Sequence, residues 1–158
     1  MSTRDWLKNS RGEWYVLAQT FLMALAFIAP RLDGASPSLG SSSGIAGTAL
    51  CAAGFTFVVL GSVGLGRSLS PFPRPKESGR LVETGVFSLV RHPIYTGLSL
   101  LALGWTVLWM SAAALLATVA LFALFDVKAR REERWLQEKF DSYGSYKARV
   151  RKLVPFVY

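Results

Sequence analysis

The stretch of this chain that decides its fold is Gly44-Ile-Ala-Gly-Thr-Ala-Leu-Cys-Ala-Ala-Gly-Phe-Thr-Phe-Val-Val-Leu-Gly-Ser-Val-Gly-Leu-Gly66, which contains no charged side chain. About 20 apolar residues in an α-helix cross the hydrocarbon core of a bilayer, which is about 30 Å thick. The stretch is long enough for that. Its recurring small residues, such as Gly47, Gly54 and Gly61, would let a second helix approach closely in lipid. We therefore predict a membrane-spanning helix over residues 44–66.

Three other segments, residues 14–29, 94–110 and 111–125, are also apolar, but each is shorter than a full span. Tilting, local thinning of the bilayer or extension into flanking residues would let them cross. Because Met110 and Ser111 leave almost no linker between the last two segments, we expect a tight helical hairpin. The predicted fold is thus an all-α integral membrane protein with about four transmembrane helices. A soluble helical bundle is the alternative, and the scarcity of charges inside the four segments argues against it.

The first apolar segment follows basic residues, as the apolar part of a signal peptide does. Its apolar run is longer than usual for such a peptide, and residues 27–30 make a poor cleavage site, so we expect a retained helix. The 158 residues suffice for one domain. In this single membrane domain, residues 1–66 would supply two N-terminal transmembrane helices. Residues 67–158 would supply a cofactor-binding loop, the hairpin and C-terminal helices.

The composition limits which partners the protein can have. Hydrophobic residues make up 51% of the chain, and the formal net charge is +8. Basic proteins often bind nucleic acid, but the long apolar runs point to membrane lipids instead, and we expect no nucleic acid and no obligate protein partner. With Cys51 and His92 as the only residues of their types, an intrachain disulfide and a metal site built from several cysteines or histidines are excluded. No metal site is predicted.

Lysine and arginine are spread unevenly over the segments that join the apolar runs. Arg31 alone lies between the first and second runs, and neither residue type occurs between the third and fourth. Cytoplasmic segments of membrane proteins collect such residues, so both termini and the predicted active site should be cytoplasmic. The small size favours a prokaryotic source, and hence a plasma membrane. The remaining basic residues fall in three groups: Arg4, Lys8 and Arg11; Arg67, Arg74, Lys76, Arg80 and Arg91; and nine from Lys128 to Lys152.

After Phe125 the pattern becomes amphipathic, with charged residues on one face and Trp135, Leu136 and Phe140 on the other. This pattern predicts that the fourth helix continues beyond the membrane. Residues 141–144, Asp-Ser-Tyr-Gly, would break it, and a short basic helix over residues 145–152 would follow. We therefore expect cytoplasmic, amphipathic C-terminal helices.

A first motif lies in the loop before the third apolar segment, where residues 80–97 read Arg-Leu-Val-Glu-Thr-Gly-Val-Phe-Ser-Leu-Val-Arg-His-Pro-Ile-Tyr-Thr-Gly. Pro93 disfavours the α conformation at His92 and suits the first turn of a helix. Arg91 and His92 would then lie beside free backbone N–H groups that can hold an anion. Gly97 would let another backbone or a ligand come close. Taken alone, an ordinary loop that contacts lipid headgroups is the simpler interpretation.

A second motif lies on the helix after the fourth segment and comprises Lys128, Arg131, Glu132, Glu133 and Trp135. Lys128 and Glu132 are four residues apart and share one helical face, while Arg131 and Trp135 share another. Taken alone, a charged helix exposed to solvent explains these residues as well as a functional site does.

Together the two motifs resemble the isoprenylcysteine carboxyl methyltransferase family and the related phospholipid methyltransferases. Residues 81–97, Leu-Val-x-Thr-Gly-Val-Phe-x-x-Val-Arg-His-Pro-Ile-Tyr-x-Gly, are close to that family's cofactor signature. The family's C-terminal motif is matched by Glu132 and Glu133, followed by Leu136, Phe140, Tyr143, Tyr146 and the pair Val154-Pro155. The resemblance covers roughly residues 66–155.

This resemblance implies that S-adenosylmethionine binds between the Arg-His-Pro loop and the helix that carries the paired glutamates. The family usually has a tyrosine where this chain has Phe87, and an arginine where it has Lys128, which keeps the charge but lacks the bidentate fork. The cofactor-binding residues that the resemblance implies are Leu81, Val82, Phe87, His92, Pro93, Ile94, Tyr95, Gly97, Glu132 and Glu133.

The resemblance also implies a reaction: O-methylation of a carboxylate on a lipophilic substrate, such as an isoprenylcysteine, that enters sideways from the bilayer. A carboxylate is already ionised near neutral pH, so positioning, rather than a general base, would drive the transfer. Lys128, with Arg131 or Arg91, would orient the carboxylate and form the catalytic set. Two alternatives stay open: N- or S-methylation of a lipid headgroup or small thiol, and a non-enzymatic membrane protein whose basic face binds anionic lipid or a partner.

Overall fold

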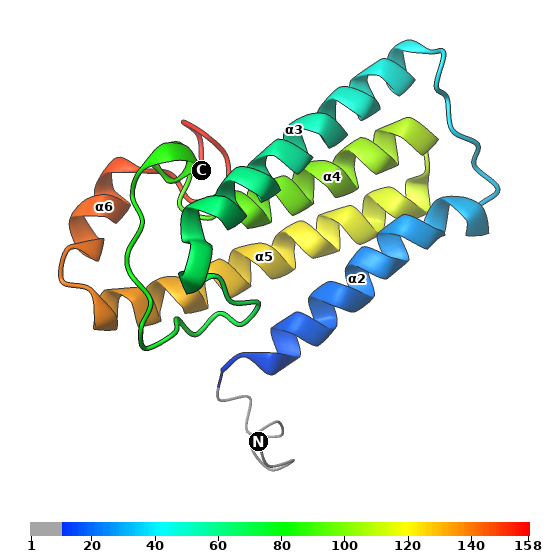
Figure 1. Ribbon diagram of the computed structural model, residues 1–158. Helices are drawn as coiled ribbons and strands as arrows, with labels where there is room; N and C mark the ends of the chain where they lie inside the picture. Colours follow the sequence, from blue (N-terminus) through cyan, green and yellow to red (C-terminus); the bar gives the residue numbers. More distant parts are fainter. Residues whose placement is uncertain (1–10) are drawn as a thin grey trace.

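The computed structural model describes residues 11–158, and this part of the chain is helical apart from loops and one isolated β-bridge. Figure 1 shows α2, α5, α4 and α3 side by side in that order, with α2 packed on α5, α5 on α4 and α4 on α3. The predicted all-α fold is therefore confirmed, while Arg4 and Lys8 lie outside the described residues. The elements are α2 (Glu13–Leu32), α3 (Ser42–Leu65), η1 (Gly66–Ser68), η2 (Gly85–Ser88), α4 (Pro93–Trp109), α5 (Ala112–Lys139) and α6 (Tyr143–Arg149).

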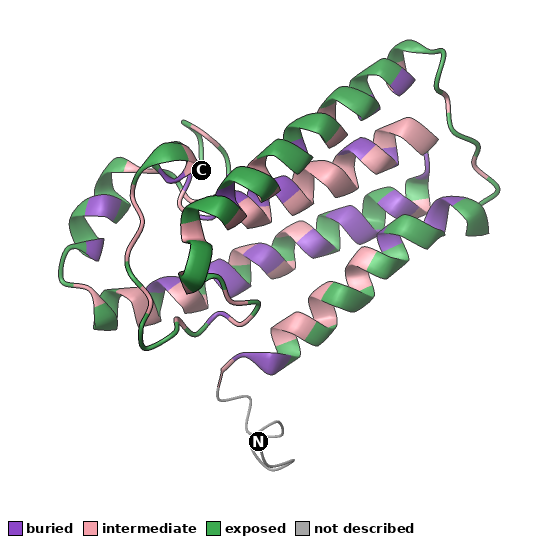
Figure 2. Cartoon of the chain, viewed as in Figure 1, coloured by how far each residue is buried: buried purple, intermediate pink, exposed green. Residues whose placement is uncertain are grey.

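The outer surfaces of the long helices are apolar. By length and composition, α2, α3 and α5 are able to cross a membrane; α4 has 17 residues, which at 1.5 Å per residue makes it about 25 Å long. Phe21, Val63 and Leu116 expose 67%, 73% and 73% of their surfaces, and Figure 2 shows how much of α2 and α3 faces outward. A soluble bundle buries such side chains, so this surface suits lipid.

Helices α3 and α4 approach so closely that only glycine fits between them. A Cβ atom on Gly54 would lie 2.6 Å from the carbonyl oxygen of Gly97, and a Cβ atom on Gly47 would lie 2.7 Å from that of Gly104. The close helix approach that we predicted for the small residues of α3 is thus present at Gly47 and Gly54. The backbone that approaches Gly97 is that of α3.

The predicted hairpin between α4 and α5 is confirmed. Met110 takes the left-handed conformation, with φ 50°, and the Ser111 side chain caps α5 by accepting from the N–H of Ala114. Asp33, after α2, accepts a hydrogen bond of 2.6 Å from the Ser111 hydroxyl. The carboxylate thus ties the end of α2 to the start of α5.

The opposite end of the bundle, here called the polar end, carries residues 66–92, the last turns of α5, α6 and the C-terminal segment. Helix α5 continues to Lys139, as predicted, and Phe140 is its C-cap residue, where the helix ends. However, α6 begins at Tyr143 rather than at residue 145 and ends at Arg149. Burial explains the earlier start, because Tyr143 and Tyr146, three residues apart, both point into the protein.

Candidate functional site

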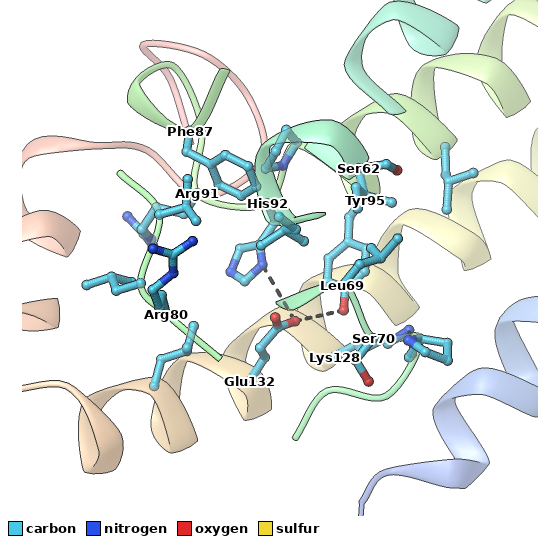
Figure 3. Close-up of a pocket in the computed structure, with 18 of the residues that line it drawn as sticks. Ser62, Leu69, Ser70, Arg80, Phe87, Arg91, His92, Tyr95, Lys128 and Glu132 are labelled. Atoms are coloured by element: carbon cyan, nitrogen blue, oxygen red, sulfur yellow. Dashed lines mark hydrogen bonds and ion pairs between the residues drawn. The ribbon is translucent and has the colours of Figure 1, made fainter. Parts of the chain in front are cut away.

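A cavity of about 350 Å³ lies at the polar end, where the loop after α3 meets the start of α4 and the later turns of α5. Figure 3 shows side chains from these elements pointing toward one another across it. Three predicted site residues, Gly97, Arg131 and Glu133, are not among those that line it. The other predicted residues do line it: Leu81, Val82, Phe87, Arg91, His92, Pro93, Ile94, Tyr95, Lys128 and Glu132.

His92 lies between the two glutamates of α5. Its Nε2 atom is 3.2 Å from Glu133 Oε1, and its Nδ1 atom is 3.7 Å from Glu132 Oε2. The imidazole stacks on the Tyr95 ring, with centroids 5.4 Å apart, and the Tyr95 hydroxyl donates a 2.8 Å hydrogen bond to Glu132. The first motif and the second motif, 37 residues apart at this bond, therefore form one site.

The paired glutamates face different surroundings. Glu133 is buried and accepts from Arg91, whose Nη2 lies 2.8 Å from Oε1, and from Lys147, whose Nζ lies 3.2 Å from Oε2. Glu132 keeps 26% of its side chain exposed and lines the cavity. Consequently Glu132 is placed to meet a ligand in the cavity, whereas Glu133, predicted to bind cofactor, pairs with Arg91 and Lys147 and does not line the cavity.

The Arg91 side chain is also engaged in contacts within the protein. Besides Glu133, its guanidinium donates to the carbonyl oxygens of Lys147 and Val150. Arg91 lines the cavity, and an acid that it oriented, as predicted, would compete with the buried Glu133 carboxylate for the guanidinium.

The backbone N–H groups of the Arg-His pair are also occupied. Arg91 N–H donates to the carbonyl of Arg151 at 2.8 Å, and His92 N–H donates to that of Lys152 at 3.1 Å. The Thr96 hydroxyl donates to Leu153 O at 2.6 Å. The C-terminal segment therefore fixes the Arg-His-Pro loop in place through the backbone N–H groups of Arg91 and His92.

Lys128 is buried, with 1% of its surface exposed, yet it makes no ion pair within the part of the chain that the structure describes. Its ammonium donates to Gln19 Oε1 at 2.6 Å and to Pro71 O at 3.1 Å, and it lies 5.0 Å from the centre of the Tyr95 ring. All three partners are neutral. Lys128 thus makes no direct ion pair with a described residue at the wall of the cavity, and the charge that acts on its ammonium is the Glu132 carboxylate, one turn further along α5.

Two tyrosines of α6 close the far wall. The Tyr146 hydroxyl donates to Phe87 O at 2.7 Å, whereas the buried Tyr143 hydroxyl has no hydrogen-bond partner within residues 11–158. Burial, the largest influence, raises the pKa of both phenols, and the Glu133 carboxylate raises that of Tyr143 further. Tyr143 thus stays protonated, and its hydroxyl is free to meet a polar group in the cavity.

Two predicted site residues point elsewhere. Gly97 packs against Gly54 and Val58 of α3, so its lack of a side chain serves helix packing rather than ligand access. The guanidinium of Arg131 lies 5.9 Å from the centre of the Tyr15 ring and 5.0 Å from that of Trp135. Because each residue turns a helix by about 100°, Arg131 faces α2 while its neighbour Glu132 faces the cavity.

The cavity also contains residues that the sequence reasoning missed, among them Gln19 on α2 and Arg80 in the loop. Gln19 had a detectable signal, because a polar amide within an apolar segment often marks a functional position in membrane proteins. Arg80 had none, since it is one of several basic residues in its loop.

The walls combine three kinds of chemistry. Aliphatic and aromatic side chains such as Ile94 and Tyr95 form an apolar surface, Glu132 contributes one carboxylate, and Lys128 contributes one buried cation. Such a cavity suits a flat, partly cationic ligand beside a second, anionic group. No described side chain is placed as an activated nucleophile, so the protein would orient reactants rather than attack them.

Comparisons with known proteins agree with this description. The family model described as phospholipid methyltransferase matches residues 42–143. The chain is 30% identical to protein-S-isoprenylcysteine O-methyltransferase of Saccharomyces cerevisiae over 94% of its length, and 29% identical to the cobalt-zinc-cadmium resistance protein CzcN of Cupriavidus metallidurans over 91%. A solved structure of the eukaryotic intramembrane Ras methyltransferase ICMT superposes with a TM-score of 0.68, at 22% identity over 91% of the chain. The chain spans 66%, 62% and 53% of these three proteins.

Proposed function

Since this chain belongs to the phospholipid methyltransferase family, we propose that it is a membrane methyltransferase that transfers the methyl group of S-adenosylmethionine to a carboxylate of a lipophilic substrate, such as an isoprenylcysteine. The observation that carries this proposal is the convergence of His92, Tyr95 and Glu132 with the buried Lys128, which makes no direct ion pair with a described residue, in one cavity. The isoprenylcysteine-like acceptor is suggested by the relatives that are named for it, and the apolar walls and the buried Lys128 of the cavity support a lipophilic acid.

The cavity fits the cofactor that the family implies. The unpartnered Tyr143 hydroxyl is an orphaned buried donor at its wall, which a polar ligand atom would satisfy. Leu81, Val82 and Ile94 supply apolar surface for an adenine ring. Glu132 supplies a carboxylate for a cationic group or a ribose hydroxyl.

When bound, S-adenosylmethionine supplies a methyl group that its sulfonium has already activated. Lys128 would hold the acceptor carboxylate in line with that methyl group, in place of its present neutral partners Gln19 and Pro71. The apolar walls would exclude water. Orientation of this kind can account for several kcal/mol of the barrier, and an ionised acid needs no base.

A lipophilic acceptor would reach the cavity from the bilayer. Gln19 on α2 and Ser62 on α3 both line it, and these two helices pack on α5 and α4 respectively. We propose that the acceptor enters from the bilayer at the side of the α4–α5 pair that α2 and α3 flank (Figure 1), with its apolar part in lipid. The polar end, which carries most of the described basic residues, would face the cytoplasm.

Calorimetry of the detergent-purified protein with S-adenosylmethionine tests the cofactor, with His92→Ala and Glu132→Ala as site variants. Binding by the wild type that both variants lose supports the proposal. If folded wild-type protein does not bind in the presence or absence of membrane lipids, the chain is not this kind of enzyme.

Product analysis with a radiolabelled methyl donor and membrane extracts then tests the acceptor. Base hydrolyses a methyl ester and releases its methyl group as methanol, whereas a methylated amine or thioether keeps its methyl group. A base-stable product would reject the carboxylate acceptor while leaving the methyltransferase activity in place.

A further inference from the structure

One cationic side chain at the cavity, that of Arg80, has no hydrogen-bond or ion-pair partner among residues 11–158. Its side chain is exposed, but its backbone is fixed, because Arg80 N–H donates to Ser68 Oγ at 3.1 Å. Arg80 is therefore held at the cavity by the loop and free to bind a ligand.

The other positive groups around the cavity are already engaged or lie deeper. Arg91 is paired with Glu133. Lys128 is buried beside Gln19. Among the described lining residues, Arg80 is thus the cation at the solvent-exposed side of the site, and Lys128 is the cation inside it.

Arg80 and Lys128 lie on opposite sides of Glu132. Figure 3 shows this arrangement, with Arg80 beside Arg91 and Lys128 beside Ser70. Along α5, Lys128 is one helical turn nearer the apolar part of the helix than Glu132, a distance of about 6 Å. The two cations are therefore suited to two separate anionic groups, one near water and one near lipid.

Resting on the proposed function, we infer that Arg80 binds the carboxylate of the amino-acid part of S-adenosylmethionine. That part carries one carboxylate and one ammonium group, and it is the most strongly hydrated part of the molecule, so it belongs at the exposed side. Arginine matches a carboxylate with two parallel N–H donors. Glu132, the one carboxylate among the described lining residues, would take a cationic or hydroxyl group. The buried Lys128 is left for the acceptor.

The test compares two ligands that differ only in the amino-acid part. S-adenosylhomocysteine carries the amino-acid part, whereas 5′-methylthioadenosine lacks it. Both are titrated by calorimetry into the detergent-purified full chain, as wild type, Arg80→Gln, Arg80→Lys and the matched control Arg67→Gln. Arg67 is an exposed residue of η1 that does not line the cavity, and its substitution removes the same charge.

We expect Arg80→Gln to weaken S-adenosylhomocysteine binding about two- to fivefold, the size of an exposed charge-assisted contact, and to leave 5′-methylthioadenosine binding unchanged. Arg80→Lys should lie in between, and Arg67→Gln should match wild type for both ligands. Equal weakening of both ligands by Arg80→Gln, or of neither, overturns the assignment of Arg80. Failure of the wild type to bind S-adenosylhomocysteine overturns the proposed function together with it.

Discussion

At the scale of single residues, neighbours on α5 are separated in role by the rotation of the helix. Glu132 and Glu133 are adjacent, yet one faces the cavity and the other is buried against Arg91 and Lys147. A turn of about 100° per residue is enough to send them in different directions. Lys128, one turn earlier, shares the cavity face with Glu132.

This difference predicts that neutralising Glu133 affects stability, whereas neutralising Glu132 affects ligand binding. Glu133→Gln leaves Arg91 without its counter-charge where the side chain is only 8% exposed, which should cost about 3 kcal/mol and lower the melting temperature in detergent. Glu132→Gln should leave the melting temperature near that of wild type and weaken S-adenosylhomocysteine binding. Thermal unfolding and calorimetry on both variants check this. Similar melting temperatures for the two variants would contradict the assigned roles.

Lys128 should act on the acceptor rather than on the cofactor. Lys128→Met removes the buried charge and should lower kcat/KM for the lipophilic acid about a hundredfold, or about 2.7 kcal/mol. Binding of S-adenosylhomocysteine should change less than about twofold, well under 1 kcal/mol.

Lys128→Arg is the matched variant, because it keeps the charge and introduces the fork that the family usually has. It should retain most of the activity, as measured by methyl transfer to isoprenylcysteine analogues. Equal loss of activity in Lys128→Arg and Lys128→Met would show that packing against Gln19, not charge, is what matters.

At the scale of elements, the α3–α4 pair sets the position of the Arg-His-Pro loop. Gly61 packs against Pro93 and Ile94 at the start of α4, so the glycine contacts along α3 extend up to the cavity. The C-terminal segment holds the same loop from the other side through the carbonyls of Arg151 and Lys152. The site is therefore built where three elements meet.

Gly54→Ala tests how much the close packing of α3 on α4 contributes to stability. The added Cβ would lie 2.6 Å from a backbone carbonyl, so the helices must separate, at a cost of about 1–3 kcal/mol. Gly144→Ala in α6 is the control, since nothing lies within 4 Å of its Cβ position and alanine favours a helix. Thermal unfolding should show destabilisation by the first substitution only. Equal stability of the two variants would mean that the helix contact is looser than the structure shows.

The sequence predicted these elements well because apolar length and motif spacing are local properties. The spans and the hairpin at Met110 followed from patterns along the chain. The convergence of His92 with Glu132 followed only from the resemblance to the family. The engagement of Arg91 did not, because it depends on Glu133, Lys147 and Val150, which only folding brings together. The direction of Arg131 likewise depends on where α2 packs.

At the scale of the whole molecule, the two ends of the bundle differ in chemistry. Away from the polar end, Trp105 stacks on Phe27 at 4.6 Å, and the Arg31 guanidinium lies 5.2 Å from the centre of the Trp109 ring. Aromatic residues of this kind gather at membrane–water interfaces. The polar end holds the cavity and the C-terminal segment. A donor dissolved in water and an acceptor dissolved in lipid would therefore meet at one membrane surface.

This asymmetry predicts which end faces the cytoplasm. Single cysteines placed at the exposed Ser36, between α2 and α3, and at the exposed Ser78, at the polar end, report the two sides. In a Cys51→Ala background, a membrane-impermeant maleimide should label Ser36→Cys in intact cells and Ser78→Cys only after permeabilisation, because basic segments stay cytoplasmic. The opposite pattern would place the cavity outside the cell, away from the cytoplasmic supply of S-adenosylmethionine, and would contradict the proposed function as well as the orientation.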